Sequence, residues 1–395
     1  MGKINYIDDV EIKNKRVLLR VDFNVSLNPN STIADDARIQ QALPTIEYLL
    51  KNHNRLIIVS HLDRPKFRDP KLSLKPVVKR LQEYLDKNYH VKLINDFLTE
   101  DPQTFQNQKP DTVFMLENIR YYPEEGANDR TFIKKLAALA DVFVNDAFGV
   151  SHRSNSSVTG VPEYLPSYGG LLLKKEIQMI SKVIDKPKKP LVAIIGGAKI
   201  SSKISLIGKL TEIADYLLIG GGLANTFLCA HEYNIGKSFC EYEEVQQPRK
   251  LLFLAARKHT AIILPDDVVV AANKTSTVTQ VCKVDEVQKN DSIFDIGPET
   301  QAKFGAIIAK AKTIIWNGPV GLTENPQFKR GTDFIYYAIT QNTEATSIVG
   351  GGDTLAAISK KEYLDKITHI STGGGAMLEF IEKGNLPGIE ALEHH

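Results

Sequence analysis

The stretch Thr346-Ser347-Ile348-Val349-Gly350-Gly351-Gly352-Asp353-Thr354-Leu355-Ala356-Ala357-Ile358 indicates a strand that turns into a helix. It contains a short apolar run, three glycines, an acidic residue, a hydroxyl residue and then a helix-forming run. Without side chains at Gly350, Gly351 and Gly352, backbone N–H groups and the positive end of the helix can approach an anion, which indicates a phosphate site. There Asp353 would meet a hard cation such as Mg²⁺, and Thr354 would cap the helix or donate to a phosphate oxygen. The alternative is a tight strand-to-helix turn with a good cap.

The composition is that of a globular chain with two domains. Its 395 residues exceed what one hydrophobic core usually supports, and 43% of them are hydrophobic. The net charge of +2 lacks the basic excess of a nucleic-acid binder, so no nucleic-acid partner is expected. The three cysteines, Cys229, Cys240 and Cys282, form no CxxC pair and no even set, which is typical of a reducing cytoplasm and argues against a thiolate zinc site.

The ends of the chain carry no signal for a membrane. Residues 1–6 contain no long apolar segment, and Tyr6 stands where a myristoylation signal needs Ser or Thr. No run elsewhere has the length of a membrane-spanning helix, so no membrane partner is expected. We interpret residues 393–395 as the start of an affinity tag and exclude His394 and His395 from any metal site.

Short runs rich in Val, Ile and Leu alternate with segments of helical period along the whole chain. We predict strands at 17–21, 56–59, 113–116 and 142–144 in the first half, and at 191–195, 216–219, 261–264, 314–316, 347–349 and 367–370 in the second. Uninterrupted apolar strands between helix-length segments are typical of parallel sheets with helices on both faces. The predicted fold class is therefore α/β, with two doubly wound, open, Rossmann-like parallel-sheet domains.

The boundary between the domains is predicted near residues 160–190. There an amphipathic helix over 171–184 lies between segments rich in proline and glycine, which is typical of a connecting helix. We divide the chain into a first domain over 1–165, a connecting helix and hinge over 166–188, a second domain over 189–376 and a C-terminal segment over 377–392.

Polar and basic residues follow the strands of the first half. Because ligands of open α/β sheets bind beyond the carboxyl ends of the strands, these residues should share one rim: Asp22, Asn24, Arg38, His61, Arg64, Arg120, Asp146, His152 and Arg153. Guanidinium groups suit carboxylate and phosphate oxygens, so this rim predicts a small polyanion as ligand. The alternative is that each arginine makes a private surface ion pair.

Glycine instead of arginine follows the strands of the second half. The segments are Gly196-Gly197-Ala198-Lys199, Gly220-Gly221-Gly222, Pro265-Asp266-Asp267, Asn317-Gly318-Pro319, Gly350 to Thr354 and Thr372-Gly373-Gly374-Gly375. Bare backbone lets a flat base and a phosphate chain come close, and Lys199 and Lys203, one helical turn apart, would present two ammonium groups on one face. This rim predicts a nucleotide.

The common nucleotide-binding motifs are nevertheless missing. Gly236-Lys237-Ser238 has His231 where a P-loop needs Gly, and no intact GxGxxG follows a strand. His152-Arg153-Ser154 lacks the catalytic Asp of the protein-kinase loop. A P-loop ATPase and a simple dinucleotide dehydrogenase are therefore disfavoured.

An ordered set of short motifs runs through both halves. Its members are Arg20-Val21-Asp22-Phe23-Asn24-Val25, Ser60-His61-Leu62-Asp63-Arg64-Pro65, Glu117-Asn118-Ile119-Arg120, Asn145-Asp146-Ala147-Phe148-Gly149, His152-Arg153, Gly196 to Lys199 with Lys203, Gly220 to Phe227, Trp316-Asn317-Gly318-Pro319, Gly350 to Thr354 and Ser371 to Ala376. One such motif alone would be weak, but the ordered set is highly specific. Over essentially its whole length the chain resembles the phosphoglycerate kinase family.

This resemblance implies a glycolytic enzyme that transfers the acyl phosphate of 1,3-bisphosphoglycerate to ADP, reversibly and with Mg²⁺, giving 3-phosphoglycerate and ATP. It implies a cytoplasmic monomer whose only partners are these small molecules. The first domain would hold phosphoglycerate and the second the nucleotide, while the C-terminal segment would pack back on the first domain. In-line transfer would follow closure of the two domains.

The resemblance also implies roles for individual residues. The phosphoglycerate would contact Asp22, Phe23, Asn24, Arg38, His61, Leu62, Asp63, Arg64, Arg120 and Arg153. The nucleotide would contact Gly197, Lys199, Lys203, Gly221, Ile293, Asn317, Glu324, Gly351, Gly352, Asp353 and Thr354. Catalytic charge would come from Arg38, Lys203, Gly351 and Gly352, and Asp353 would bind or orient the metal.

Five positions depart from the family pattern: Ser26 in place of Pro, Asp63 in place of Gly, Asn155 in place of His, Thr323 in place of Phe, and Ile293 in place of Gly. The carboxylate of Asp63 would compete with the substrate's oxygens or pin Arg64. Two other functions remain open: a non-catalytic nucleotide-binding protein on the same fold, which a coupled assay of ATP formation would separate, and a dehydrogenase, which nicotinamide binding would revive.

Overall fold

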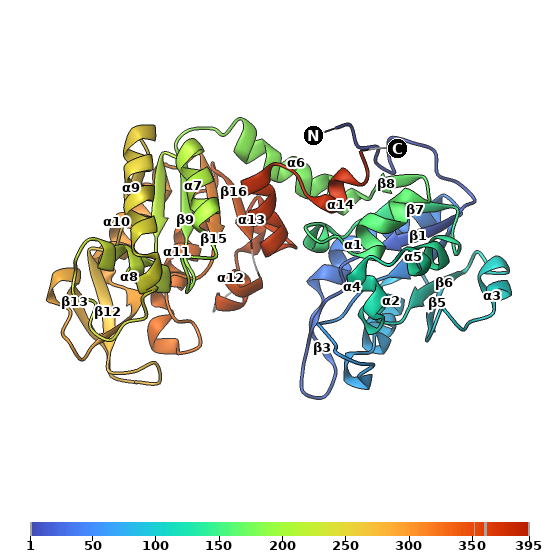
Figure 1. Cartoon of the computed structure of the whole chain (residues 1–395), viewed down its shortest axis with the longest axis horizontal. Coiled ribbons are helices and arrows are strands. Elements are labelled where there is room, and N and C mark those ends of the chain that lie inside the picture. Colours follow the sequence, from blue (N-terminus) through green and yellow to red (C-terminus); the bar gives the residue numbers. More distant parts are fainter. Residues whose placement is uncertain (1, 351, 359–361, 394–395) are drawn as a thin grey trace. The chain divides into compact units, whose positions relative to one another are not determined.

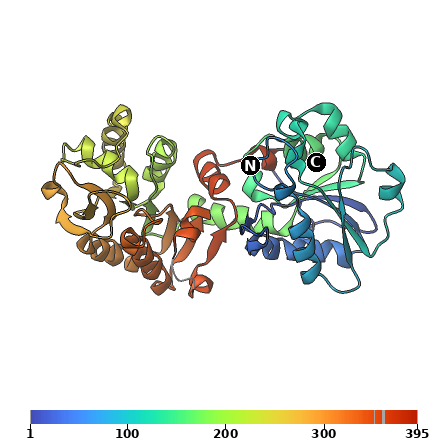
Figure 2. The same ribbon diagram turned by 90° about the horizontal axis from the view of Figure 1, so that it is seen from below.

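The computed structural model describes residues 2–350, 352–358 and 362–393. It divides the chain into two compact units, unit 1 with Met1–Gln178 and Lys383–His395 and unit 2 with Met179–Glu382. Each unit contains a six-stranded parallel sheet, and helices lie on both faces of each sheet (Figures 1 and 2). The predicted fold class, α/β with two open parallel-sheet domains, is confirmed.

The sheet of unit 1 has the strand order β5-β6-β4-β1-β7-β8. Its strands are β1 (Arg16–Arg20), β4 (Arg55–Val59), β5 (His90–Ile94), β6 (Thr112–Leu116), β7 (Val142–Asn145) and β8 (Ser167–Gly169). Arg20 at the end of β1 is in register with Val59 on one side and Asn145 on the other. The carboxyl ends of β4, β1 and β7 therefore lie side by side, at the point where the strand order reverses and where ligands of such sheets bind.

The helices of unit 1 are α1 (Ala37–Lys51), α2 (Lys75–Tyr84), α3 (Pro102–Gln106), α4 (Pro123–Ala127), α5 (Arg130–Ala137), α6 (Leu171–Asp185) and α14 (Pro387–Glu390), and a short hairpin joins β2 (Ser26–Leu27) to β3 (Ile33–Asp35). In α1 the buried residues Ile39, Ala42, Ile46 and Leu49 recur every three or four positions, so one face packs on the sheet. Arg38 in the first turn of α1 is thereby carried to the strand ends.

The sheet of unit 2 has the order β11-β10-β9-β15-β16-β17. Its strands are β9 (Leu191–Ile195), β10 (Tyr216–Ile219), β11 (Ala261–Ile263), β15 (Thr313–Asn317), β16 (Thr346–Gly350) and β17 (His369–Ser371). The helices are α7 (Ile204–Ile213), α8 (Gly221–Ala230), α9 (Gln246–Lys258), α10 (Pro298–Lys310), α11 (Arg330–Gln341), α12 (Gly352–Ala357) and α13 (Gly374–Lys383). Here β9 stands between β10 and β15, so the glycine segments after these three strands share one edge.

A small antiparallel sheet, order β13-β12-β14, was not predicted. Its strands are β12 (Asp267–Ala271), β13 (Gln280–Lys283) and β14 (Ser292–Ile296). The predicted segment Pro265-Asp266-Asp267 after the strand at 261–264 is only partly a loop, because Asp267 begins β12. This sheet forms one wall of the cavity described below.

The connecting helix and the C-terminal segment differ in detail from the prediction. Helix α6 covers the predicted helix, and the division between the units falls within it, between Gln178 and Met179. Residues 377–382 continue α13 in unit 2, so the segment that joins unit 1 begins at Lys383 and not at residue 377. Figure 1 shows α14, in red, among the blue and green elements of unit 1, where the N–H of Gly388 donates to the carbonyl of Ser151 at 2.8 Å.

Among the described residues, no helix combines the length and the apolar character needed to cross a membrane. The predicted tag histidines His394 and His395 lie outside the described residues.

Candidate active site

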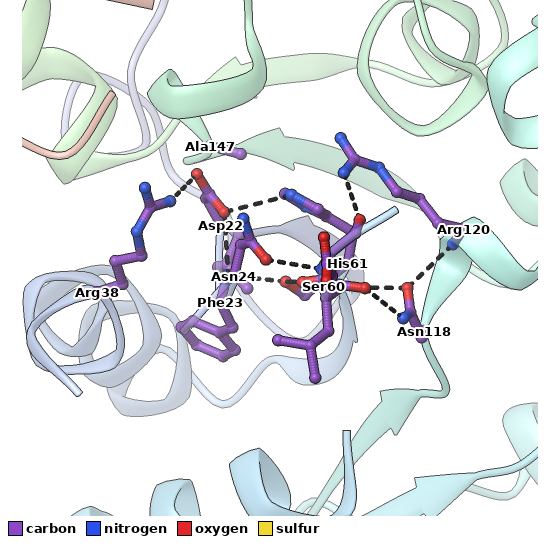
Figure 3. Close-up of polar contacts among 12 residues, drawn as sticks. Asp22, Phe23, Asn24, Arg38, Ser60, His61, Asn118, Arg120 and Ala147 are labelled. Carbon is purple, nitrogen blue, oxygen red and sulfur yellow. Dashed lines mark hydrogen bonds and ion pairs between the residues drawn. The ribbon is translucent and has the colours of Figure 1, made fainter. Parts of the chain in front are cut away.

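Asp22 is the centre of the rim on unit 1. It follows β1, only 8% of its side chain is exposed, and its carboxylate forms an ion pair with Arg38 from α1 (Figure 3). The Nε2 of His61, which follows β4, lies 3.8 Å from the Asp22 carboxylate. Burial alone would raise the pKa of Asp22, but the charge of Arg38, with that of Arg20 and the hydrogen bond from the N–H of Asn24, outweighs it and the pKa is lowered to about 2.

His61 itself is a neutral imidazole in this setting. It is 2% exposed. Burial lowers its pKa well below the usual value, the positive charges of Arg20, Arg120 and Arg38 act in the same direction, and only Asp22 opposes them. At neutral pH the ring is therefore a hydrogen-bonding group and not a cation.

Asn24 and Arg120 hold the backbone of Asp63. The N–H of Asp63 donates to Asn24 Oδ1 at 2.7 Å, and Arg120 Nη1 donates to the Asp63 carbonyl at 2.6 Å (Figure 3). Asp63 has φ of 54°, in the left-handed region that glycine adopts most easily. No ion pair joins its exposed side chain to Arg64 among the described residues, so the predicted pinning of Arg64 is wrong.

Two buried residues support this loop and were not among the predicted site residues. The N–H of Phe23 donates to Ser60 Oγ at 2.8 Å. Asn118 accepts from the N–H of Leu62 at 3.2 Å and donates to the Leu62 carbonyl at 2.8 Å. Ser60 is the first residue after β4 and Asn118 is the second after β6, so their position close behind a strand was the available signal.

Three arginines of the rim have no acidic partner within 4 Å in the described part of the chain: Arg64, Arg120 and Arg153. Arg64 is exposed, and the other two are half-buried. Burial, together with the nearby charges of Arg20 and Arg153, lowers the pKa of Arg120 to about 10. The alternative of private ion pairs thus holds for Arg38 but not for these three, whose charges remain available to an anion.

On unit 2, Lys203 ties together the ends of the central strands. Its Nζ donates to the carbonyl of Gly196 at 2.7 Å and to Asn317 Oδ1 at 2.8 Å, and Asn317 Nδ2 donates to the carbonyl of Gly350 at 2.8 Å. Helix α7 begins at Ile204, so the prediction that Lys199 and Lys203 share a helical turn is wrong. Lys199 is exposed in the loop before this helix.

Thr354 serves the framework of this rim. It lies inside α12, and its buried hydroxyl donates to the carbonyl of Gly350 at 2.9 Å and accepts from the N–H of Gly318 at 2.8 Å. The prediction that it caps the helix is therefore wrong, and in this structure its hydroxyl is already engaged. Gly351 and the side chain of Asp353 lie outside the described residues, and Gly352 begins α12.

The glycines of this rim bring two loops into contact. Gly221 has φ of 68°, and a Cβ there would lie 2.7 Å from the carbonyl oxygen of Gly197, which itself has φ of 105°. A side chain at Gly221 would be both strained and in collision with backbone. The closeness of the loops after β9 and β10 thus depends on glycine.

A cavity of about 620 Å³ opens between these loops and the small antiparallel sheet. Predicted residues Gly197, Gly221, Ile293 and Glu324 line it. Prediction missed Phe239, Leu228, Asn225 and Asp295, which also line it. The Oδ1 of Asn225 is buried without a hydrogen-bond partner, so this amide is available to a bound molecule. A mostly apolar cavity of this size suits a base and its sugar.

The donor set for a metal is small. The described residues include no group of three or more His, Cys, Asp or Glu side chains able to hold a metal ion. Mg²⁺ in phosphoryl-transfer enzymes is commonly held by one or two carboxylates together with substrate phosphates and water. Such a Mg-nucleotide complex needs only one or two carboxylates from the protein.

Comparison with known proteins gives a consistent result. The family model described as phosphoglycerate kinase matches residues 7–384. A phosphoglycerate kinase of Dictyoglomus turgidum is 48% identical over 397 residues, covering 100% of both chains, and one of Moorella thermoacetica is 46% identical over 99% of both. The solved structure of phosphoglycerate kinase from Coxiella burnetii superimposes with a TM-score of 0.88 at 40% identity, covering 99% of both chains.

Proposed function

The chain belongs to the phosphoglycerate kinase family and is a glycolytic phosphotransferase that acts on a nucleotide, and from this premise we propose how its residues divide the reaction. Unit 1 binds the phosphoglycerate and unit 2 binds the nucleotide. The observation that carries this division is the set of arginines without an acidic partner, Arg64, Arg120 and Arg153, found on the rim of unit 1.

The ligand of unit 1 carries a phosphate and a carboxyl group, and the rim suits both. Guanidinium groups form paired hydrogen bonds to either group. His61, as a neutral donor, and Asn24 add directional contacts, while the bulk of Phe23 and Leu62 is buried beneath them. Asp22 orients Arg38 and does not repel the ligand, because its own charge is balanced by Arg38.

The nucleotide lies with its base in the cavity of unit 2 and its phosphates toward the glycine loops. Ile293 and Glu324 line the cavity beside Gly197 and Gly221, and they would contact base and ribose. Lys203 and Asn317 stand at the strand ends where the phosphates would lie. Lys199 is exposed nearby and would reach the outer phosphates.

The transfer itself needs alignment and charge, not a covalent enzyme intermediate. An oxygen of the terminal phosphate of ADP attacks the phosphorus of the acyl phosphate. The bond from phosphorus to the carboxyl oxygen breaks, and the carboxylate leaves with the electron pair, so no proton has to be moved. We assign Arg38, Lys203 and the backbone N–H groups of Gly351 and Gly352 to the negative charge of the group in transfer.

Mg²⁺ enters with the nucleotide and supplies positive charge to its phosphate oxygens, and Asp353 would bind or orient it. Because the two ligands belong to different units, transfer also requires the units to close, with α6 as the connecting helix. We further propose a cytoplasmic monomer, since the intermediates of glycolysis are cytoplasmic and the resembling family acts on small molecules alone. Sedimentation of the purified protein tests the oligomeric state.

The division of labour is tested by kinetics of single arginine variants. ATP formation from ADP and 1,3-bisphosphoglycerate is followed with a coupling enzyme, and the KM for 3-phosphoglycerate is measured in the reverse direction. Arg64→Ala, Arg120→Ala and Arg153→Ala should each raise that KM by about 10- to 100-fold, since a hydrogen bond to a charged group contributes roughly 1.5–3 kcal/mol. The KM for ATP should not change.

Arg130→Ala is the matched control, because Arg130 is an exposed arginine of unit 1 at the start of α5 and is not one of the predicted rim residues. Equal effects of Arg130→Ala and the three rim variants would overturn the assignment. A purified, folded wild-type chain without ATP formation would overturn the catalytic function and revive the non-catalytic alternative.

A further inference from the structure

A chain of buried polar groups lies behind the pair formed by Asp22 and His61. It starts at Arg20, the last residue of β1, which is only 2% exposed. The Nη2 of Arg20 lies 3.3 Å from His61 Nδ1, and its Nε donates to Ser157 Oγ at 2.9 Å. The Nη1 of Arg20 donates to the carbonyl of Val21.

Glu125 closes this chain on the far side. The hydroxyl of Ser157 donates to Glu125 Oε1 at 2.7 Å, and the N–H of Ser157 donates to Glu125 Oε2 at 2.9 Å. Glu125 is 2% exposed and Ser157 is 1% exposed. Each oxygen of the carboxylate therefore accepts a hydrogen bond, which is the pattern of an ionised group.

The direction of every hydrogen bond in the chain is fixed. A guanidinium group has donors and no acceptor, so Ser157 Oγ accepts from Arg20 and must pass its own hydrogen to Glu125. For the same reason His61 Nδ1, facing Arg20, must be the acceptor. The proton of the neutral ring then lies on Nε2, the nitrogen that faces Asp22 at 3.8 Å.

The charges in the chain are also balanced. Burial lowers the pKa of Arg20, while the carboxylates of Glu125 and Asp22 on its two sides raise it. Burial raises the pKa of Glu125 above its ordinary value, and the charge of Arg20 and the two hydrogen bonds from Ser157 oppose this shift. Each buried charge is thus compensated by its neighbours, and removing one link leaves the next without a partner.

An unusual backbone turn places Ser157. Residues Ser156–Gly160 form a π-helical turn, a rare conformation that often occurs at functional sites. A Cβ on Gly160 would lie 2.4 Å from the Ile133 side chain, and Asn155 Nδ2 donates to the carbonyl of Glu125 at 3.2 Å. The turn is therefore packed tightly against α4 and α5, and Ser157 has little freedom to move.

We propose that Glu125 and Ser157 are positioning residues of the phosphoglycerate site: they hold Arg20, and Arg20 fixes His61 with its proton on Nε2, directed toward Asp22 and the bound substrate. This inference rests on the proposed role of His61 in binding the phosphoglycerate. It adds residues from α4 and the π-helical turn, more than 100 positions from Arg20 along the chain, to those that determine how the substrate is bound.

The test compares Ser157→Ala with Ser156→Ala. Ser156 is a fully buried neighbour in the same turn, and its hydroxyl donates to the carbonyl of Glu124 at 2.9 Å and not to the chain that holds Arg20. Both variants lose one buried hydroxyl from the same turn, so an effect of lost packing is shared. Ser157→Ala removes the hydrogen bonds to Arg20 and Glu125, whereas Ser156→Ala removes only the one to the Glu124 carbonyl. Two quantities are measured: the ring ¹⁵N chemical shifts of His61 in the ligand-free, full-length protein, and the KM for 3-phosphoglycerate.

Ser157→Ala should shift the His61 ring toward the Nδ1–H tautomer and raise the KM for 3-phosphoglycerate about tenfold, since a buried donor is left unpaired. Ser156→Ala should keep the wild-type tautomer and KM. The Kd for Mg-ADP should be unchanged in both. An unchanged tautomer and KM in Ser157→Ala, or an equal change in Ser156→Ala, overturns the proposal.

Glu125→Gln is the second variant, used if Ser157→Ala does not fold. It keeps the size of the side chain and removes the charge that balances Arg20, so the tautomer and the KM should move as in Ser157→Ala. A wild-type tautomer in Glu125→Gln would also overturn the proposal. The NMR readout needs no turnover, so a failure of this inference is distinguishable from a failure of the proposed function.

Discussion

Replacing Asp146 by asparagine should stabilise the protein relative to wild type by an amount that grows as the pH rises toward 7. Asp146 follows β7 and is fully buried. Its Oδ1 accepts from the N–H of Leu173 in the first turn of α6 at 3.0 Å, whereas its Oδ2 has no hydrogen-bond partner. Gly170 packs directly against the Asp146 carboxyl group, since a Cβ on Gly170 would lie 2.1 Å from Asp146 Oδ1.

Burial raises the pKa of Asp146 to about 7, and the nearby carboxyl of Glu176 acts in the same direction against the hydrogen bonds from α6 and Thr45. In the unfolded chain the pKa of an aspartate is about 3.9. Between these two values the folded state binds a proton that the unfolded state has lost, so the free energy of unfolding falls as the pH rises. Above about pH 7 both states are ionised and the loss is complete.

The magnitude of the effect follows from the difference of about three units between the pKa of Asp146 in the folded and in the unfolded state. At roughly 1.4 kcal/mol for each unit, the wild type loses up to about 4 kcal/mol between pH 4 and pH 7 through this group alone. Asparagine resembles the protonated acid, because its oxygen can still accept from Leu173 and it carries no charge to desolvate. The difference between Asp146→Asn and wild type should therefore change by about 2–3 kcal/mol from pH 5 to pH 7.

The assay is urea unfolding at pH 5, 6, 7 and 8, followed by far-ultraviolet circular dichroism. The single tryptophan, Trp316, lies in β15 of unit 2, so its fluorescence gives a separate signal from the unit that does not contain Asp146. Asp141→Asn is the control, because hydrogen bonds and charge from Arg16 outweigh burial and lower the pKa of Asp141. That carboxylate is ionised in both states across this range, so its variant should differ from wild type by a constant.

A constant offset for Asp146→Asn over the same pH range would refute the reasoning. It would mean that the buried carboxylate stays charged in the folded protein, supported by the first-turn N–H groups of α6.

Three further predictions concern the reaction. Arg38→Ala should raise the activation free energy by roughly 3 kcal/mol, which lowers turnover about 100-fold, because the charge of Arg38 acts on the transition state. The affinity for ATP should stay near wild type, and near-normal turnover at saturating substrates would exclude the role. Asp353→Ala should reduce activity without weakening the binding of 3-phosphoglycerate. Titration calorimetry measures the affinity for each ligand separately, and an equal loss of both affinities would contradict the site assignment. The radius of gyration from solution scattering should fall most when 3-phosphoglycerate and a non-hydrolysable Mg-nucleotide are bound together. An unchanged radius with both ligands would refute the proposed closure of the two units.

The positions of the parallel strands could be predicted because strands buried on both faces are continuous apolar runs. The predicted run at 191–195 is β9, and that at 216–219 is β10. The antiparallel sheet was not predicted because its edge strand β13 is mostly exposed and forms no apolar run, so the run of valines in β12 had no predicted partner strand. The run His90–Ile94 alternates between exposed and buried residues at the sheet edge, so β5 gave a weaker signal.

The candidate site could be predicted only as a set of residue types after strands. Which of these residues form hydrogen bonds with one another could not be predicted, because such contacts join residues that are far apart in the sequence. Arg20 and Ser157 are 137 positions apart, and Asn24 meets Asp63 across 39. Lys203 looked like a helical partner of Lys199 by spacing alone, but the helix starts one residue after it. A spacing of four indicates a shared face only where the helix is already formed.

The rims of unit 1 and unit 2 differ in how their positive groups are arranged to bind an anion. On unit 2, Lys203 is already bonded to Gly196 and Asn317, so backbone and one fixed cation form a surface ready for phosphates. On unit 1, the charges of Arg20 and Arg153 help to lower the pKa of Arg120, so the positive groups of this rim repel one another. A polyanion relieves this repulsion, and that gain adds to the direct hydrogen bonds. Inorganic phosphate or sulfate should therefore stabilise unit 1 against unfolding and compete with 3-phosphoglycerate, whereas a neutral glycerate ester should do neither, because it cannot offset the charge of these arginines.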